Sequence, residues 1–266
     1  MFEEGPEEAW ARRYGARPPL VAPDVSSFLN HRSVRRFRDE VVEESLVEWL
    51  VACAQSAATS SNLQLWSMVS VQDPDRRAEV SRLCDNQKQV LYAPWFFAFV
   101  LDHHRLRSAA QQADEQCLGL DYNEFFTMGV IDVALAAERL VCAAEHIGLG
   151  TCYIGALRND PAGVKELLRL PVGCVGLFGL CLGWPSEPAK PLIKPRFRQD
   201  DVWFRESYGK PSADEFNQRM RDFYTEQGMS TDHTWSKKSG IRVDEHHLTG
   251  REVLKSFLTE QGLDKR

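Results

Sequence analysis

The feature that most constrains the fold of this chain is a long helical stretch, Asp121 to Ile147, with almost no polar face between Met128 and Ala144. A helix that is apolar nearly all round is either buried or packed against a partner subunit. Gly148 directly follows the stretch and indicates its C-terminal end, because glycine readily adopts the left-handed conformation of a helix cap. Other elements, or a second copy of the chain, are therefore expected to surround this helix.

Short helical and extended patterns alternate along the rest of the chain. Helical periodicity predicts helices from near Asp24 and over residues 42–57, 74–84 and 160–168, and a polar, mostly helical tail over 212–266. Apolar runs predict strands over residues 65–71, 95–101, 152–156 and 174–183. Because these elements follow no regular strand–helix repeat, we expect an α+β protein with a mixed layer rather than a parallel doubly wound sheet.

The domain organisation is expected to be simple. Residues 1–23 are charged and rich in proline and glycine, and are interpreted as an extension outside the core. Residues 24–266 are expected to form a single domain, since 266 residues suffice for one good core. Four prolines between Pro185 and Pro195 predict an extended linker, and the helical tail predicts a C-terminal excursion from the domain.

Composition excludes several classes of protein. The net charge of −6 disfavours a nucleic-acid binder, which usually needs a basic face. The longest apolar run, residues 90–101, is broken by Pro94 and is far shorter than the roughly 20 residues that span a bilayer. The N-terminus is acidic where a signal peptide would be basic. We therefore expect a cytoplasmic protein that binds neither nucleic acid nor membrane.

Cysteine and histidine spacing argues against disulfide and metal chemistry. The seven cysteines are odd in number, form no Cys-x-x-Cys pair and lie mostly among apolar residues, which is typical of buried free thiols in a reducing compartment. The adjacent pairs His103–His104 and His246–His247 point different ways on any regular element, so we interpret them as solvated surface histidines. No metal site, dinucleotide fingerprint, phosphate-binding loop or nucleophile elbow is expected.

A basic cluster is the first sign of a ligand site. Arg32, Arg35 and Arg36 lie within five positions together with Ser33, and guanidinium groups suit phosphate oxygens. Taken alone, this cluster is more often a charged surface turn than a ligand site, because basic clusters are common. Three further segments change that balance: the small donors of residues 59–64, the small residues of 152–158, and the two cations of residues 194–196.

Together and in this order, these segments resemble one family, the oxygen-insensitive NADPH nitroreductases and flavin reductases of the nitroreductase superfamily, specifically the major bacterial nitroreductase type. The resemblance runs from about Ser26 to the C-terminus. Its supporting strings are His31–Phe37, Thr59–Gln64, Asn86–Lys88, Gly148–Asn159, Gly179–Pro185 and Lys194–Arg196.

The resemblance implies a nitroreductase-like fold, with a mixed, mainly antiparallel central sheet flanked by helices, in an interlocked homodimer. It further implies one FMN per subunit, held without a covalent link at the dimer interface by the domain of residues 24–266. By position, the FMN-binding residues are His31, Arg32, Ser33, Arg35, Thr59, Ser60, Ser61, Gln87, Tyr153, Ile154, Gly155, Ala156, Lys194 and Arg196.

Within that set, the resemblance divides the roles. His31, Arg32, Ser33, Lys194 and Arg196 would hold the phosphate and ribityl chain. Arg35 and Gln87 would meet the polar edge of the ring, Thr59, Ser60 and Ser61 would line it, and the Gly155 N–H would face flavin N5. Tyr153, Ile154 and Ala156 would shape the strand that carries Gly155.

The implied activity needs no catalytic side chain, because the flavin carries the hydride chemistry. NADPH, or NADH, donates electrons, and nitroaromatics, quinones or related compounds accept them in a ping-pong scheme. The acceptor would lie against Arg35, Ser61, Asn62 and Arg158. Two alternatives stay open for Arg158, namely pairing with the acceptor and a surface salt bridge.

The sequence departs from the family pattern at three places. Asn62 replaces an aromatic residue, and Ala156 replaces a glycine. Thr231–His233 stand where an Arg pair that binds NADPH is expected, and Asp232 would repel a 2′-phosphate unless Lys237 or Lys238 compensates. Two rival functions therefore remain: a reductase of free flavin on the same fold, and a non-catalytic protein that stores or senses FMN.

Overall fold

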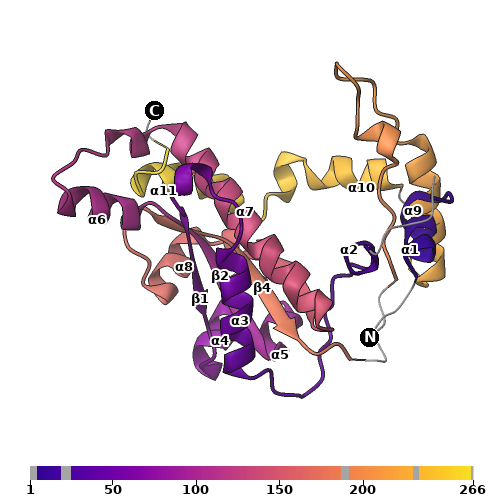
Figure 1. The fold of residues 1–266 in the computed structure, drawn as a ribbon, viewed down its shortest axis with the longest axis horizontal. Helices are drawn as coiled ribbons and strands as arrows, with labels where there is room; N and C mark the ends of the chain where they lie inside the picture. The colour runs from indigo at the N-terminus through magenta and orange to yellow at the C-terminus, as the bar shows by residue number, and fades with distance from the viewer. Residues whose placement is uncertain (1–4, 19–24, 187–191, 230–233, 265) are drawn as a thin grey trace. The chain divides into compact units, whose positions relative to one another are not determined.

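The computed structural model describes residues 5–18, 25–186, 192–229, 234–264 and 266 (Figure 1). The chain divides into two compact units, the first formed by Met1–Arg32 with Lys190–Leu248 and the second by Ser33–Ala189 with Thr249–Arg266. The expected division into an extension of residues 1–23 and a single domain of residues 24–266 stays a prediction. Each unit is described by itself.

The second unit is built on a four-stranded sheet with the order β1-β2-β4-β3, in which every neighbouring pair is antiparallel. Its strands are β1 (Trp66–Ser70), β2 (Trp95–Asp102), β3 (Gly150–Ile154) and β4 (Cys174–Gly183). All four strands were predicted from sequence, and the α+β class with a mainly antiparallel central sheet is confirmed.

Helices of the second unit cover the sheet, and the described elements of this unit are α3 (Glu44–Gln55), η1 (Ser60–Asn62), α4 (Pro74–Leu83), α5 (Lys88–Tyr92), α6 (His104–Gln112), η2 (Leu118–Asp121), α7 (Asn123–His146), η3 (Gly155–Arg158), α8 (Pro161–Leu168), η7 (Arg251–Val253) and α11 (Leu254–Glu260). Local chemistry explains several boundaries. Asp73 and Asp160 cap α4 and α8 by accepting from backbone N–H groups, and proline occupies the first turn of both helices.

The sheet separates two apolar cores because side chains alternate along each strand. Phe97, Phe99 and Leu101 of β2 pack with α3, α7 and α11 on one face. Phe96 and Ala98 of the same strand pack on the opposite face with α4, α5 and α8. The strand is therefore buried on both faces, which explains its nearly continuous apolar sequence.

The long helix α7 is amphipathic in the structure rather than buried all round. Its inner face places Val133, Ala137 and Leu140 in the core, whereas Ile131 and Leu135 are 51% and 44% exposed. The helix ends as predicted, since Gly148 has a φ of +86°. The outward apolar side chains are what a helix needs if it also packs against a partner subunit.

The first unit contains α1 (Pro6–Tyr14), α2 (Ser26–Leu29), η5 (Gln199–Asp201), α9 (Asp214–Glu226), α10 (Trp235–Arg242) and η6 (Glu245–His247). Its aromatic centre joins Phe197, Phe216 and Trp235, with ring centroids 4.3 to 5.4 Å apart. In α1, Ala9 is fully buried and Arg13 is only 5% exposed. The described part of residues 1–23 thus contains a helix that packs within the first unit.

The structure differs from the sequence interpretation at three cysteines and at one histidine. All seven cysteines are free, but Cys53, Cys117 and Cys142 are only partly buried. His103 was expected at the surface, and this prediction is wrong because its side chain is fully buried. His103 directly follows β2, and its backbone N–H donates to the Gly173 carbonyl at 2.9 Å, which draws it into the fold.

Candidate functional site

The predicted basic segment lies along the edge of β3. The Val34 N–H donates to the Thr151 carbonyl at 2.8 Å, and the Arg38 N–H donates to the Trp184 carbonyl at 2.8 Å. Ser33 and Thr151 form a parallel bridge. This anchorage leaves the Arg35 side chain exposed beside the strand.

The positive charge of Arg35 affects the pKa of a buried thiol in β3. Burial raises the pKa of the Cys152 thiol, and the Arg35 guanidinium partly offsets that rise. The pairing of Ser33 and Val34 with Thr151 brings the segment that carries Arg35 beside the same strand. The strand leads directly into η3, which begins at Gly155.

Gly155 has open space where a side chain would be. A Cβ added there would meet only the Arg158 Nη2 within 4 Å, at 3.6 Å. At Gly179, by contrast, the added Cβ would lie 2.4 Å from Phe96. Arg158 borders the open position, and its Nη1 donates to the Leu177 carbonyl of β4. The two alternatives for Arg158 stay predictions.

The residues around Gly155 pack against the protein on both faces of the sheet. Ile154 and Ala156 are buried in the core beside α4, α5 and α8, so the extra methyl of Ala156 lies against the protein interior. Tyr153 lies on the other face of β3, where its hydroxyl donates to Glu138 at 3.1 Å. Its ring makes an edge-on contact with Phe178, at 5.3 Å between centroids.

The turn that contains Thr59–Asn62 is held by a single buried carboxylate on α7. The Thr59 hydroxyl donates to Asp132 at 2.5 Å, the Ser60 N–H at 3.1 Å and the Leu65 N–H at 3.0 Å. Asp132 is only 1% exposed, so these three donors satisfy a charge that is costly to bury alone. Asp132 therefore sets the path of the turn.

The same turn contains three strained residues. Ser61, Asn62 and Gln64 have φ values of +51°, +55° and +51°, a region that non-glycine residues rarely adopt. Each such residue costs about 1–3 kcal/mol and persists only where surrounding contacts impose it. Ser61 and Asn62 are exposed, as is needed for residues that contact a ligand.

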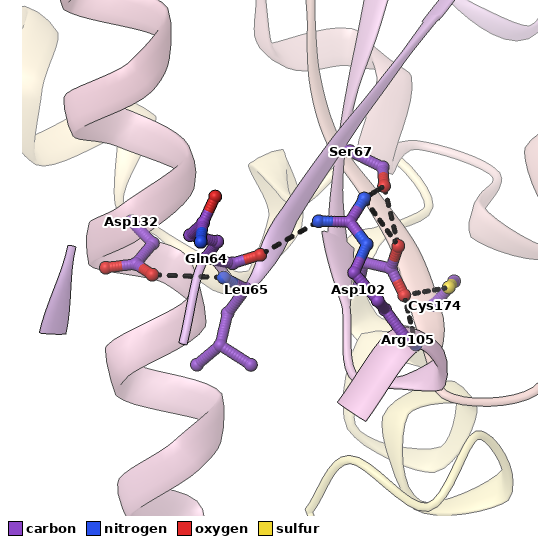
Figure 2. Close-up of polar contacts among 7 residues, drawn as sticks. All are labelled: Gln64, Leu65, Ser67, Asp102, Arg105, Asp132 and Cys174. Atoms are coloured by element: carbon purple, nitrogen blue, oxygen red, sulfur yellow. Dashed lines mark hydrogen bonds and ion pairs between the residues drawn. The ribbon is translucent and has the colours of Figure 1, made fainter. Parts of the chain in front are cut away.

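A second set of contacts holds the end of the turn from the opposite side (Figure 2). Arg105 Nη1 donates to the Gln64 carbonyl at 3.2 Å, and its Nη2 donates to the Ser67 hydroxyl at 2.7 Å. The Ser67 hydroxyl in turn donates to Asp102 at 2.6 Å. Figure 2 shows Gln64 and Leu65, which follow the turn, between this network and Asp132.

The network keeps Asp102 charged. Burial alone would raise the pKa of Asp102, but hydrogen bonds from Ser67, the Arg105 N–H and Cys174 outweigh it and leave the pKa lowered. Burial, with the neighbouring Asp102, raises the pKa of the Cys174 thiol to about 12. A charged Asp102 and a protonated Cys174 are therefore the resting states at neutral pH.

The remaining predicted residue of the second unit, Gln87, stands at the N-cap position of α5, where its side chain makes no capping hydrogen bond. Its side-chain oxygen accepts from the Gln89 amide at 2.6 Å, and its backbone carbonyl accepts from the Ser81 hydroxyl at 3.3 Å. Gln87 is half-buried, so its amide group is held by neighbouring residues of the same turn.

Four predicted phosphate ligands belong to the first unit. His31 is half-buried, Arg32 is 7% exposed, and Lys194 and Arg196 are exposed. Arg32 Nη1 donates to the Asn30 carbonyl at 2.9 Å. Cations on two short extended segments suit a dianionic phosphate, because both charge and donor number match it.

The predicted nucleotide region is only partly described. Thr231, Asp232 and His233 lie outside the described residues. Thr234 caps α10 by accepting from the Lys237 N–H at 3.2 Å. The Lys238 ammonium lies 3.7 Å from the Tyr224 ring centroid, so this cation already has a local partner.

In each unit, the described residues fit one part of a flavin mononucleotide. In the second unit, the open position at Gly155 gives a flat ring room to approach backbone N–H groups, with Arg158 at its border. The exposed cation Arg35 follows the residues that pair with β3. In the first unit, the cations Arg32, Lys194 and Arg196, together with the His31 imidazole, suit a phosphate. The predicted ligands thus form separate groups, namely Ser33–Arg35 with β3, Gly155–Arg158, the Thr59–Asn62 turn, Gln87, and the cations of the first unit.

The residues that support these groups carry little signal in the sequence. Asp132, Arg105 and Asp102 were not predicted, although Asp132 is an isolated acid in an apolar helical stretch, which is itself a signal. No local pattern marks Arg105, because its partners Gln64 and Ser67 are distant in sequence.

Comparison with known proteins gives consistent matches. The profile described as "Nitroreductase family" matches residues 29–184, and "Nitroreductase family, C-terminal domain" matches residues 194–266. The chain is 34% identical over 250 residues to "FMN reductase (NADPH)" of Bacillus subtilis, covering 91% of this chain and 98% of that protein. It is 35% identical over 221 residues to the "Oxygen-insensitive NADPH nitroreductase" of Salmonella typhimurium, covering 81% and 89%. The solved structure of NfrA1 nitroreductase from B. subtilis aligns with a TM-score of 0.83 at 33% identity, covering 91% and 99%.

Proposed function

Because the chain belongs to the nitroreductase family, we propose that it is an FMN-dependent oxidoreductase that passes electrons from NAD(P)H to a small oxidised organic acceptor. The family resemblance inferred from the sequence is confirmed. Nitroaromatics and quinones are the acceptor classes that we expect.

The observation that carries this proposal is the open position at Gly155. A backbone that leaves room for a flat ring, with Arg158 bordering it and Arg35 beside the same strand, is what a flavin site requires. When bound, FMN supplies the two-electron chemistry between donor and acceptor.

The protein residues have binding and electrostatic roles in this proposal. Arg35 supplies positive charge at the polar edge of the ring, which favours the reduced state. Ser61 and Asn62, presented by the strained turn, line the acceptor site, and Arg158 contributes a cation at its border. His31, Arg32, Ser33, Lys194 and Arg196 bind the phosphate and ribityl chain.

A second activity has support from one comparison. The relative from Bacillus subtilis is called an FMN reductase, and an open flavin face would admit a second flavin as acceptor. Steady-state rates with free FMN, a quinone and a nitroaromatic compound distinguish these activities. A higher kcat/KM for free FMN would favour the flavin reductase.

The test of the proposed function is the visible spectrum of the purified protein under argon, before and after addition of NADPH or NADH. We expect bound flavin absorbance that NADPH bleaches. Faster bleaching by NADH would make NADH the preferred donor and would indicate that Asp232 repels the 2′-phosphate of NADPH. Flavin that neither nucleotide bleaches would favour storage or sensing, and a protein that cannot be loaded with FMN would refute the assignment.

The assembly is part of the proposal. Ile131 and Leu135 are exposed one helical turn apart on α7, which suits a homodimer interface. An Ile131→Glu, Leu135→Glu double variant is expected to reduce the mass measured by light scattering from dimer to monomer. The interlocking of C-terminal segments and the cytoplasmic location stay predictions. In the described parts of the chain, no helix combines the length and apolarity that crossing a bilayer requires.

A further inference from the structure

Helix α1 lies outside the residues that the family profiles match, since the first match begins at residue 29. It is nevertheless packed within the first unit, where Ala9 is fully buried and Arg13 is 5% exposed. An arginine that is almost completely buried on a short helix requires an explanation, because burying a charge is costly unless hydrogen bonds compensate.

The Arg13 side chain binds the backbone that leads into the first cationic segment. Its Nε donates to the Leu29 carbonyl at 2.7 Å, and its Nη2 donates to the His31 carbonyl at 3.1 Å. Both contacts use the planar fork of the guanidinium, which fixes the orientation of the two peptide groups. Arg13 thereby sets the position of His31 and the start of Arg32.

The backbone of Arg13 binds the second cationic segment. The Arg13 carbonyl accepts from the Arg196 N–H at 2.9 Å and from the Arg219 Nη1 at 2.7 Å. The same Arg219 Nη1 donates to the Arg196 carbonyl at 2.8 Å. Arg219 therefore joins Arg13 and Arg196, and the end of α1 is fixed to the segment that carries Lys194.

We propose that Arg13, with Arg219, is a positioning residue of the phosphate site, which joins the His31–Arg32 and Lys194–Arg196 segments through its side chain and its carbonyl. This inference rests on the proposed FMN-dependent function. In this proposal α1 fixes the spacing of the cations before the phosphate binds. Binding then loses less conformational entropy.

The test compares a flavin with a phosphate and a flavin without one. Dissociation constants of FMN and riboflavin are measured by flavin fluorescence for the full-length wild type and for Arg13→Gln, Arg13→Lys and Arg219→Gln. Arg12→Gln is the matched control, since Arg12 lies on the same helix but pairs with Glu226 at 3.3 Å.

We expect Arg13→Gln and Arg219→Gln to raise the Kd for FMN about tenfold, as the loss of charge-assisted hydrogen bonds implies, and to change the Kd for riboflavin less than about twofold. Arg13→Lys should restore part of the FMN affinity, and Arg12→Gln should match the wild type. If Arg13→Gln fails to fold, Arg219→Gln decides by the same comparison.

Two results would overturn the inference while leaving the proposed function intact. The first is unchanged FMN affinity in Arg13→Gln and Arg219→Gln. The second is an equal loss of FMN and riboflavin affinity, which would show a general structural role. A wild type that binds no FMN would instead refute the proposed function, and the inference with it.

Discussion

The Asp132 carboxylate accepts a hydrogen bond from the Thr59 hydroxyl at 2.5 Å, and this contact joins the long helix α7 to the turn that presents Ser61 and Asn62. Asp132 also accepts from the N–H groups of Ser60 and Leu65. The Asp132 carboxylate therefore holds the strained turn from the side of α7, opposite the Arg105 contacts.

Replacing that charge by an amide should release the turn. We expect Asp132→Asn to lower the free energy of unfolding by about 2–3 kcal/mol, because a charged acceptor of three hydrogen bonds is lost. The Kd for FMN should rise as the strained residues relax. Urea unfolding and flavin titration measure both effects. Glu124→Gln, an exposed substitution on the same helix, is the control, and equal behaviour of the two variants would contradict the role of Asp132.

Gly155 should be needed for flavin binding and not for folding. Gly155→Ala is expected to change the free energy of unfolding of the flavin-free protein by less than about 0.5 kcal/mol, since the added methyl meets only the Arg158 Nη2 at 3.6 Å. Its FMN affinity and turnover should fall, because the methyl occupies the space of the ring.

Gly179→Ala provides the opposite case. Its Cβ would lie 2.4 Å from Phe96 in the core, so we expect destabilisation of about 1–3 kcal/mol. Thermal unfolding and steady-state rates of the two variants should separate stability from flavin binding. Normal flavin binding by Gly155→Ala would remove the main support for the proposed site.

Arg35 should tune the flavin potential. Its side chain is exposed and its charge reaches the Cys152 thiol of β3, so Arg35→Gln should leave stability unchanged. Loss of a cation at the polar edge of the ring should lower the two-electron potential by about 30 mV, which corresponds to about 1.4 kcal/mol. Dye-equilibrated reductive titration measures the potential. Arg36→Gln, at the next exposed position, should behave as the wild type, and a similar shift in both would argue against a specific role for Arg35.

The regular elements could be predicted because their causes are local. The apolar run of β2 and the Asp–Pro starts of α4 and α8 carry their own signals within a few residues. The predicted C-terminal end of α7 also holds, since Gly148 supplies the conformation that ends the helix.

The supports of the candidate site could not be predicted in the same way, because their partners are remote in sequence. Arg13 contacts Leu29, His31 and Arg196, so no local pattern distinguishes it from the charged residues around it. Ala156 shows the same limit: it was identified only as a departure from the family pattern, and the sequence did not indicate that the fold buries its methyl in the protein core.

His103 is also buried by contacts with residues that are distant in sequence. Its burial makes the free energy of unfolding depend on pH. Its Nε2 lies 3.1 Å from the Phe125 carbonyl, to which it donates, and its side chain is fully buried. Burial lowers the pKa of His103 below the usual 6.5. As the pH falls below about 6.5, the unfolded chain therefore gains a proton before the folded chain does.

The stability contributed by neutral His103 is thus complete above pH 6.5 and is lost as the pH falls toward the folded-state pKa, at up to about 1.4 kcal/mol per pH unit. Urea unfolding between pH 7.5 and 5.5 should show this loss in the wild type and a flatter dependence in His103→Gln. His104→Gln, which changes the exposed neighbour, should keep the wild-type slope. Equal slopes in the wild type and His103→Gln would show that the buried imidazole is not the group that titrates.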